Sequence, residues 1–221
     1  MWIKFGPKVG LSFSELPNNT KYIIGNQHIY GGYHFGVLVE FRLYKQLFIQ
    51  PGFLITNKGS KYIVRNDSDS STTGFSDFQF SSFNADIPLN LICKFDLGTF
   101  KLFLIAGPNL GYGLTGKWKG SDGTSSNVHF GNGSDDDLKL FDFGLNIGGG
   151  LEVGRIQLSS QYYQGLRTLS TLTPPLKEQK YKGLNISIVW LFGNDERVYR
   201  GYGSRYLRKH RQNTGQRKIR Y

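Results

Sequence analysis

A two-residue alternation of apolar and polar side chains is the feature that most constrains the fold of this chain. It recurs in eight segments, at residues 3–13, 31–44, 46–58, 80–95, 100–115, 140–153, 156–167 and 181–192. Side chains of a β-strand point alternately to opposite faces, so each segment is predicted to be a strand with one apolar face. At roughly 10 to 15 residues, the segments match membrane-spanning strands and exceed the usual length in soluble sheets.

The segment at 100–115 has an ambiguous register. Phe103 and Ile105 fall on the face that is otherwise polar, so its pattern does not settle which side faces inward.

The connections between the segments alternate in length. Long polar stretches occupy residues 15–30, 60–78, 116–139 and 168–180, whereas tight turns occupy 44–46, 96–99 and 154–155. Outer-membrane barrels combine long outer loops with short periplasmic turns. The sequence therefore predicts an all-β fold, an eight-stranded antiparallel up-and-down transmembrane β-barrel over residues 1–193, with both chain ends in the periplasm.

Composition agrees with a barrel and excludes a membrane-spanning helix. Apolar residues make up 38% of the chain and the mean hydropathy is −0.35. No run of about 18 apolar residues occurs, which a transmembrane helix requires. The sequence begins directly in a strand pattern, so we expect that an exported protein has already lost its signal peptide.

Aromatic residues gather at the ends of the segments. Beside the short turns, the predicted membrane-interface aromatics are Trp2, Tyr44, Phe48, Phe95, Phe100, Trp190 and Phe192. A second band toward the long loops contains Phe13, Tyr33, Phe83, Tyr112, Phe141 and Tyr162. Such bands favour a membrane barrel over the alternative, a soluble lipocalin-like barrel that binds a small molecule inside an apolar interior.

The polar faces predict a charged barrel interior. The residues expected in this lumen network are Lys4, Lys8, His34, Glu40, Arg42, Asp86, Lys94, Asp142 and Glu152. Eight strands leave a lumen just wide enough for side chains. Because buried charges must be paired, we expect a salt-bridged plug and no aqueous pore.

A basic, tyrosine-containing tail follows the last strand at residues 194–221. It holds nine lysines and arginines against two acidic residues, a net charge of +7 out of +11 for the chain. This composition can bind nucleic acid, but a periplasmic location argues for a protein or lipid partner instead. The predicted docking residues are Arg197, Tyr199, Arg200, Tyr202, Arg205, Tyr206, Arg208, Lys209 and Arg211. The alternative is a solvated extension without a partner.

Other candidate sites are weaker. Clustered carboxylates in two outer loops are cation candidates, at Asp67, Asp69, Asp135, Asp136 and Asp137, but neither loop has an EF-hand spacing. Trp118, His129 and Phe130 are candidates for contact with a surface ligand. No nucleophile elbow, Walker loop or His-Glu-x-x-His motif occurs, so we predict no enzyme activity and no cofactor.

An ordered set of short motifs resembles a known family. The motifs are Gly6-Pro7-Lys8-Val9-Gly10-Leu11-Ser12-Phe13, Gly32-Tyr33-His34-Phe35-Gly36-Val37, Ile49-Gln50-Pro51-Gly52-Phe53, Asp86-Ile87-Pro88-Leu89, Ala106-Gly107-Pro108, Phe141-Asp142-Phe143-Gly144-Leu145-Asn146 and Tyr162-Tyr163-Gln164-Gly165-Leu166. Over residues 3–193 the chain resembles the outer-membrane β-barrels of Bacteroidota described as PorT-like or "porin family". The resemblance implies a Gram-negative outer-membrane barrel without catalytic residues, and PorT itself is linked to type IX secretion. The tail after Trp190-Leu191-Phe192 departs from the family pattern.

These observations predict a non-enzymatic barrel that is a subunit or anchor of a larger cell-envelope assembly, secretion machinery included. Its expected partners are outer-membrane lipid and a periplasmic or outer-membrane protein. Two alternatives stay open: a free-standing barrel whose outer loops bind a surface ligand or that supports the membrane, and the soluble barrel described above.

Overall fold

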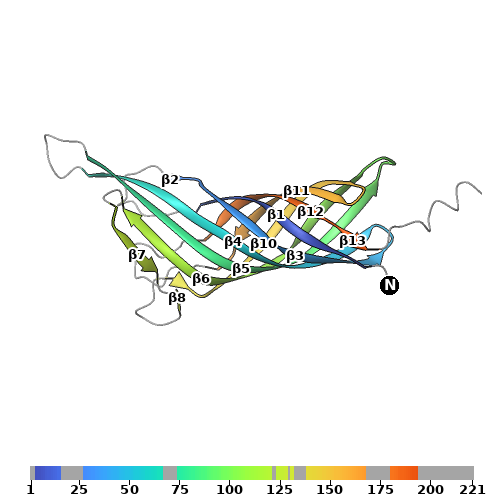
Figure 1. Cartoon of the computed structure of the whole chain (residues 1–221), viewed down its shortest axis with the longest axis horizontal. Coiled ribbons are helices and arrows are strands. Elements are labelled where there is room, and N and C mark those ends of the chain that lie inside the picture. Colours follow the sequence, from blue (N-terminus) through green and yellow to red (C-terminus); the bar gives the residue numbers. More distant parts are fainter. Residues whose placement is uncertain are drawn as a thin grey trace, which may run out of the picture.

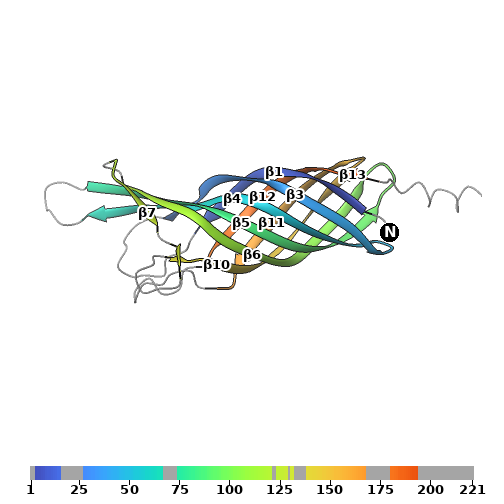
Figure 2. The same ribbon diagram turned by 60° about the horizontal axis from the view of Figure 1, so that its bottom comes forward.

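Eight long antiparallel strands form one closed barrel (Figures 1 and 2). The computed structural model describes residues 3–15, 27–66, 74–120, 123–128, 130–131, 138–167 and 180–193. The long strands are β1 (Ile3–Glu15), β3 (Tyr30–Tyr44), β4 (Leu47–Asn66), β5 (Gly74–Asp96), β6 (Lys101–Gly120), β10 (Phe141–Val153), β11 (Ile156–Gly165) and β12 (Lys182–Trp190). The short strands are β2 (Gln27–His28), β7 (Ser125–Val128), β8 (Phe130–Gly131), β9 (Leu138–Lys139) and β13 (Phe192–Gly193). Each predicted segment therefore coincides with a strand.

The barrel closes because each long strand pairs with two others. The order β10-β11-β12-β1-β3-β4-β5-β6 is completed by pairing of β6 with β10. The first strand pairs with the last ones, since Lys8 of β1 pairs with Val189 of β12 and Lys4 of β1 pairs with Gly193 of β13. Closure leaves none of the eight long strands with an unpaired edge in the barrel, as a membrane-spanning sheet requires.

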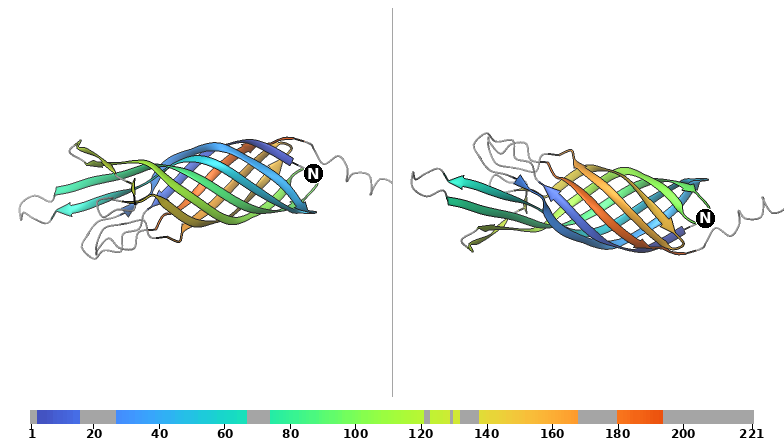
Figure 3. Two further views of the ribbon diagram at one scale, coloured as in Figure 1. Left: turned by 90° about the horizontal axis from the view of Figure 1, so that it is seen from below. Right: turned by 90° about the horizontal axis from the view of Figure 1, so that it is seen from above.

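Three tight turns lie at the end of the barrel where β1 begins, near the N-terminus of the chain (Figure 3). Two of them use glycines with positive φ, Gly98 at 92° and Gly154 at 60°, a backbone region that side chains disfavour. At Gly98 the backbone N–H also donates a hydrogen bond to Asp96 Oδ1 at 2.9 Å. The third turn places Lys45 at a φ of 34°. The turns occur where the sequence predicts them.

The opposite end differs from the sequence prediction, because strand pairing continues into stretches expected to be loops. Strands β4 and β5 remain paired up to Asn66 and Gly74, and β6 runs on to Gly120, where β7 joins it. These extensions form a protruding sheet, made of residues 59–66, 74–81, 116–120 and 125–128, which projects beyond the barrel (Figures 1 and 2). The prediction of loops at 60–78 and 116–139 is wrong for these parts. Strands outside a membrane lack a lipid-facing apolar side, so alternation fades while backbone pairing persists.

The outer face of the barrel is apolar and the inner face is mainly polar. Large exposed apolar side chains line the outer face of every long strand, for example Val9 on β1, Val37 on β3 and Ile147 on β10. A soluble barrel has the reverse arrangement, so the soluble lipocalin-like alternative is wrong. In the part of the chain that the structure describes, no helix is both long and apolar enough to cross a membrane.

Strand β6 settles the ambiguous register. Phe103 and Ile105 are buried in the lumen, with 2% and 3% of their surface exposed, whereas Leu104 is 60% exposed on the outer face. Beside Phe83, the pairing of β6 with β5 shifts by one residue, so that even-numbered residues of β6 face inward after the shift. Beyond it, Gly116 faces inward and Lys117 outward. The pattern was ambiguous because apolar residues occupy both faces of β6.

Candidate functional site

The lumen near the tight turns holds a dense charge network, which we call the lower network. Its members are Lys4, Glu40, Gln50, Lys94, Glu152 and Gln157, all buried. Lys94 bridges two carboxylates, at 2.5 Å from Glu40 Oε1 and 2.5 Å from Glu152 Oε2. Lys4 lies 3.3 Å from the other oxygen of Glu152. Two lysines thus neutralise two glutamates.

Two glutamine amides complete the lower network. Gln50 and Gln157 each donate a hydrogen bond to Glu40 Oε2 at 3.0 Å, and Gln157 donates another to Glu152 at 2.9 Å. Strands β3, β4, β5, β10 and β11 are therefore linked through side chains across the lumen. A buried network in which each member has partners rigidifies its surroundings.

An apolar cluster lies beside the lower network inside the barrel. It consists of Phe48, Ile92, Phe103 and Ile105. The Nζ atom of Lys94 lies 4.5 Å from the centre of the Phe48 ring, so the aromatic face adds to the stabilisation of this ammonium. The cluster and the network thus place buried side chains inside the barrel next to the tight turns.

A second group of polar residues, the upper network, lies farther from the tight turns. Lys58 Nζ is 2.8 Å from Asp86 Oδ1, and the Tyr163 hydroxyl donates a hydrogen bond to Asp142 Oδ2 at 2.6 Å. Lys58 also lies 4.8 Å from the Tyr163 ring centre. His34 contacts Ser12 of β1 through Nδ1 at 3.0 Å and Ser187 of β12 through Nε2 at 2.9 Å. Strands β1 and β12 pair with each other.

Beside the upper network is a cavity of about 20 Å³, lined in part by Lys8, His34, Asn109, Asn146 and Asn185. This volume suffices for one water molecule, and its walls offer several polar partners. This part of the lumen therefore has room for isolated water.

Glycines on the inner face create the space that the bulky lumen residues occupy. A Cβ atom at Gly10 would lie 2.6 Å from the ring atoms Cε1 and Nε2 of His34. A Cβ atom at Gly144 would overlap the ring of Tyr163. The abundance of glycine on the polar faces thus follows from the width of an eight-stranded barrel.

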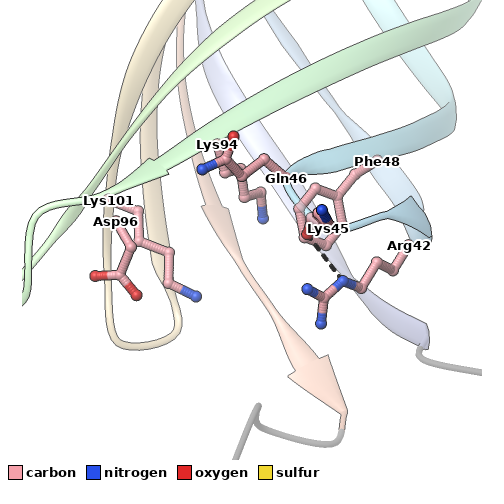
Figure 4. Close-up of a pocket in the computed structure, with 7 residues that line it drawn as sticks. All are labelled: Arg42, Lys45, Gln46, Phe48, Lys94, Asp96 and Lys101. Atoms are coloured by element: carbon pink, nitrogen blue, oxygen red, sulfur yellow. Dashed lines mark hydrogen bonds between the residues drawn. The ribbon is translucent and has the colours of Figure 1, made fainter. Parts of the chain in front are cut away.

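At the tight-turn end the lumen opens into a pocket of about 270 Å³, which we call the mouth pocket (Figure 4). It is lined by Arg42, Lys45, Gln46, Phe48, Lys94, Asp96 and Lys101. Arg42 Nε donates a hydrogen bond to the Lys45 carbonyl at 2.9 Å, and its guanidinium lies 5.9 Å from the Phe48 ring. Basic side chains outnumber acidic ones here, so the mouth pocket is suited to an anionic group.

Eight of the nine residues expected in the lumen network are buried there, and Arg42 is the exception. It is half-buried at the mouth pocket, because its strand ends two residues later at the turn. Four buried lysines, Lys4, Lys8, Lys58 and Lys94, match four buried carboxylates, Glu40, Asp86, Asp142 and Glu152. The buried lysines and carboxylates of the described lumen are therefore equal in number.

Sequence reasoning missed several lumen residues. Lys58, Gln50, Gln157 and Tyr163 were not among the expected network, although Lys58 and Gln50 share the polar parity of their segment. Assigning every second residue of each strand to the lumen, starting from its polar face, identifies these four residues as inward-facing. The specific pairs depend on the stagger of distant strands, which no single segment encodes.

The interface aromatics divide into two groups. Tyr44, Phe95, Phe100, Trp190 and Phe192 are exposed on the outer surface near the tight turns. Phe48 is only 2% exposed and points into the lumen, so its assignment to the interface is wrong. It shares the inward parity of Gln50, two residues later, and its proximity to a turn does not change that parity.

The band toward the long loops lies on the outer surface. Tyr33 packs edge-on against Phe83 at 6.2 Å, and Tyr112 against Phe141 at 5.2 Å. Trp118 instead packs against buried Phe80 at 5.0 Å, which removes much of its surface from contact with a ligand.

Some predicted sites lie outside the described residues. These are Trp2, the acidic loop residues Asp67, Asp69, Asp135, Asp136 and Asp137, His129 and the whole tail at 194–221. Within the described ranges, no group of three or more metal-ligating side chains occurs.

Comparisons with solved structures give similar barrels of low sequence identity. Neisserial surface protein A is 14% identical with a TM-score of 0.43, covering 85% of this chain and 97% of that one. Ail of Yersinia pestis, solved with the heparin analogue sucrose octasulfate, is 13% identical with a TM-score of 0.43, covering 87% and 100%. OprG of Pseudomonas aeruginosa is 10% identical with a TM-score of 0.44, covering 86% and 96%.

The family assignment comes from the sequence. A comparison with curated proteins finds no match. A family model described as "Outer membrane protein beta-barrel domain" matches residues 3–170, about three quarters of the chain. With the apolar outer face and the filled polar lumen, this match shows that the chain belongs to the outer membrane protein beta-barrel domain family, as a non-enzymatic barrel of the Gram-negative outer membrane.

Proposed function

We propose that this barrel is a non-conducting anchor or subunit of a larger cell-envelope assembly and that it docks through its periplasmic end. The observation that carries the proposal is the lumen, which is packed with side chains and holds equal numbers of buried lysines and carboxylates. Buried ion pairs and an apolar cluster lie inside the barrel beside the tight turns, where they would obstruct the passage of a solute. A barrel that does not conduct and does not catalyse acts through its surfaces.

The tight-turn end offers the surface best suited to docking. Short turns of outer-membrane barrels face the periplasm. The mouth pocket opens at this end with Arg42, Lys45 and Lys101 on its walls. Gly193 pairs with Lys4 at the same end of the barrel, and the basic tail follows Gly193 in the sequence. Both features favour an acidic periplasmic partner, in which arginine and tyrosine would provide anchoring contacts.

The resemblance to PorT-like barrels of Bacteroidota supports a secretion-related assembly as the setting. The alternative function is a free-standing barrel that binds a surface ligand at its outer end. The protruding sheet favours this alternative, because it extends paired strands beyond the barrel.

Deleting residues 194–221 tests the docking proposal. We expect the full chain, isolated from its native membranes, to co-purify with a distinct envelope protein, and the deletion to reduce that yield by about tenfold or more. Quantitative mass spectrometry of the two preparations measures the change. A chain of unchanged length with Gln at the nine basic tail positions separates charge from chain length.

Heat-modifiable gel mobility must be the same for each variant, which shows that the barrel is folded. Equal recovery of the same partners with the deletion variant contradicts docking through the tail. Failure of the full chain to co-purify with any envelope protein supports the free-standing alternative.

A further inference from the structure

Three lysines form a cluster on the outward face of the protruding sheet. Gln79 of β5 pairs with Lys61 of β4 on one side and with Lys119 of β6 on the other. Lys61 and Lys119 therefore occupy one row, about 10 Å apart across two strand spacings. Lys117 lies two residues along β6, about 7 Å from Lys119. This spacing brings three ammonium groups within reach of one polyanionic headgroup.

The neighbouring inward residues fix the direction of the three side chains. Phe80 of β5 and Ser60 of β4 are fully buried, and Trp118 of β6 packs against Phe80. Adjacent residues of a strand point to opposite faces, so Lys61, Lys117 and Lys119 point outward, and all three are exposed. They continue the surface that faces lipid lower on the barrel.

The height of the cluster places it at the headgroup level of the outer leaflet. Thr115 pairs with Phe83 of the upper aromatic band, and Lys117 lies two residues farther out. On strands tilted as in outer-membrane barrels, each two-residue step rises about 5 Å. Lys117 then lies about 5 Å above this aromatic level, and Lys119 about 10 Å above it. Aromatic bands mark the boundary between hydrocarbon and headgroups.

The cluster carries uncompensated positive charge among the residues that the structure describes. The three lysines have no ion-pair partner there, and exposed His28 pairs with Lys61 from β2. Lysine binds phosphate as a point charge and needs no fixed geometry, which suits a fluid lipid surface.

We propose that Lys61, Lys117 and Lys119 bind the phosphate groups of the outer-leaflet glycolipid and fix the barrel's depth and orientation against that leaflet. The inference is independent of the periplasmic docking proposed above, since it concerns the opposite end of the barrel. Each lysine near an anionic lipid surface contributes about fivefold to the binding constant.

The test uses full-length purified protein and two glycolipid probes, a lipid A carrying two phosphates and its dephosphorylated form. We expect wild-type protein to bind the phosphorylated lipid more tightly, and K117Q/K119Q to weaken that binding by about tenfold or more. K61Q/K117Q/K119Q should remove most of the preference for phosphate, whereas the corresponding lysine-to-arginine variant should retain it. Native mass spectrometry in detergent measures bound lipid.

The matched control is R155Q, which removes an exposed charge at the tight-turn end outside the mouth pocket and should leave glycolipid binding unchanged. Unaltered heat-modifiable mobility shows that each variant is folded. Equal binding of both lipids, or an unaffected triple variant, overturns the proposal. Tighter binding of inorganic phosphate than of the glycolipid also overturns it, because the site would then serve a soluble anion.

Discussion

Replacing Lys94 with Met is expected to destabilise the barrel by about 3–5 kcal/mol, because the substitution leaves two buried carboxylates without their shared counterion. Lys94 is 3% exposed and lies 2.5 Å from both Glu40 and Glu152. In the variant, Glu152 keeps its contact with Lys4. Glu40 loses its ion pair with Lys94. Urea unfolding of the protein in lipid vesicles, followed by tryptophan fluorescence and gel mobility, measures the loss.

Two companion variants isolate the charge effect. Lys45→Met removes an exposed lysine at the turn and should change stability by less than about 0.5 kcal/mol. Lys94→Met combined with Glu40→Gln restores a neutral lumen and should recover about 1–3 kcal/mol relative to the single variant. A Lys94→Met barrel as stable as wild type would show that the lower network does not bear on stability.

Replacing Phe48 with Ala is expected to cost about 3–5 kcal/mol, the range for truncating a buried aromatic in a packed interior. Phe48 packs with Ile92, Phe103 and Ile105 inside the lumen, and the ring also lies against the ammonium of Lys94. The substitution therefore leaves a cavity and removes the aromatic face beside a buried charge. Unfolding in the same vesicle assay measures the change.

The matched control for Phe48→Ala is Phe95→Ala, on the outer face near the same end. Lipid can fill the space left at Phe95, so that variant should lose less stability than Phe48→Ala. A larger loss for Phe95→Ala than for Phe48→Ala would contradict the inward placement of Phe48.

The strand pattern made most of the fold predictable. Alternation of Phe141, Phe143 and Leu145 with Asp142 and Gly144 identifies strand and face together, because a two-residue period has one structural meaning. The tight turns followed from short polar breaks such as Gly154-Arg155. Neither inference requires knowledge of distant residues.

Features that depend on strand stagger or on backbone pairing alone were not predictable. The Lys58–Asp86 pair forms between strands whose register is set by the whole closed barrel. The protruding sheet continues where residues such as Lys61 and Lys119 no longer alternate with lipid-facing apolar ones. Phe48 was misassigned for a different reason. Its position beside a turn suggested an interface aromatic, whereas the strand alternation directs its side chain into the lumen.

The central claim is that paired charges and apolar side chains fill the lumen of a closed barrel. Conductance of purified full-length protein in planar lipid bilayers tests it most directly. With insertion verified by protease protection of the barrel, the filled lumen predicts current indistinguishable from that of the bare bilayer. Discrete, reproducible conductance steps that scale with the amount of inserted protein would contradict it.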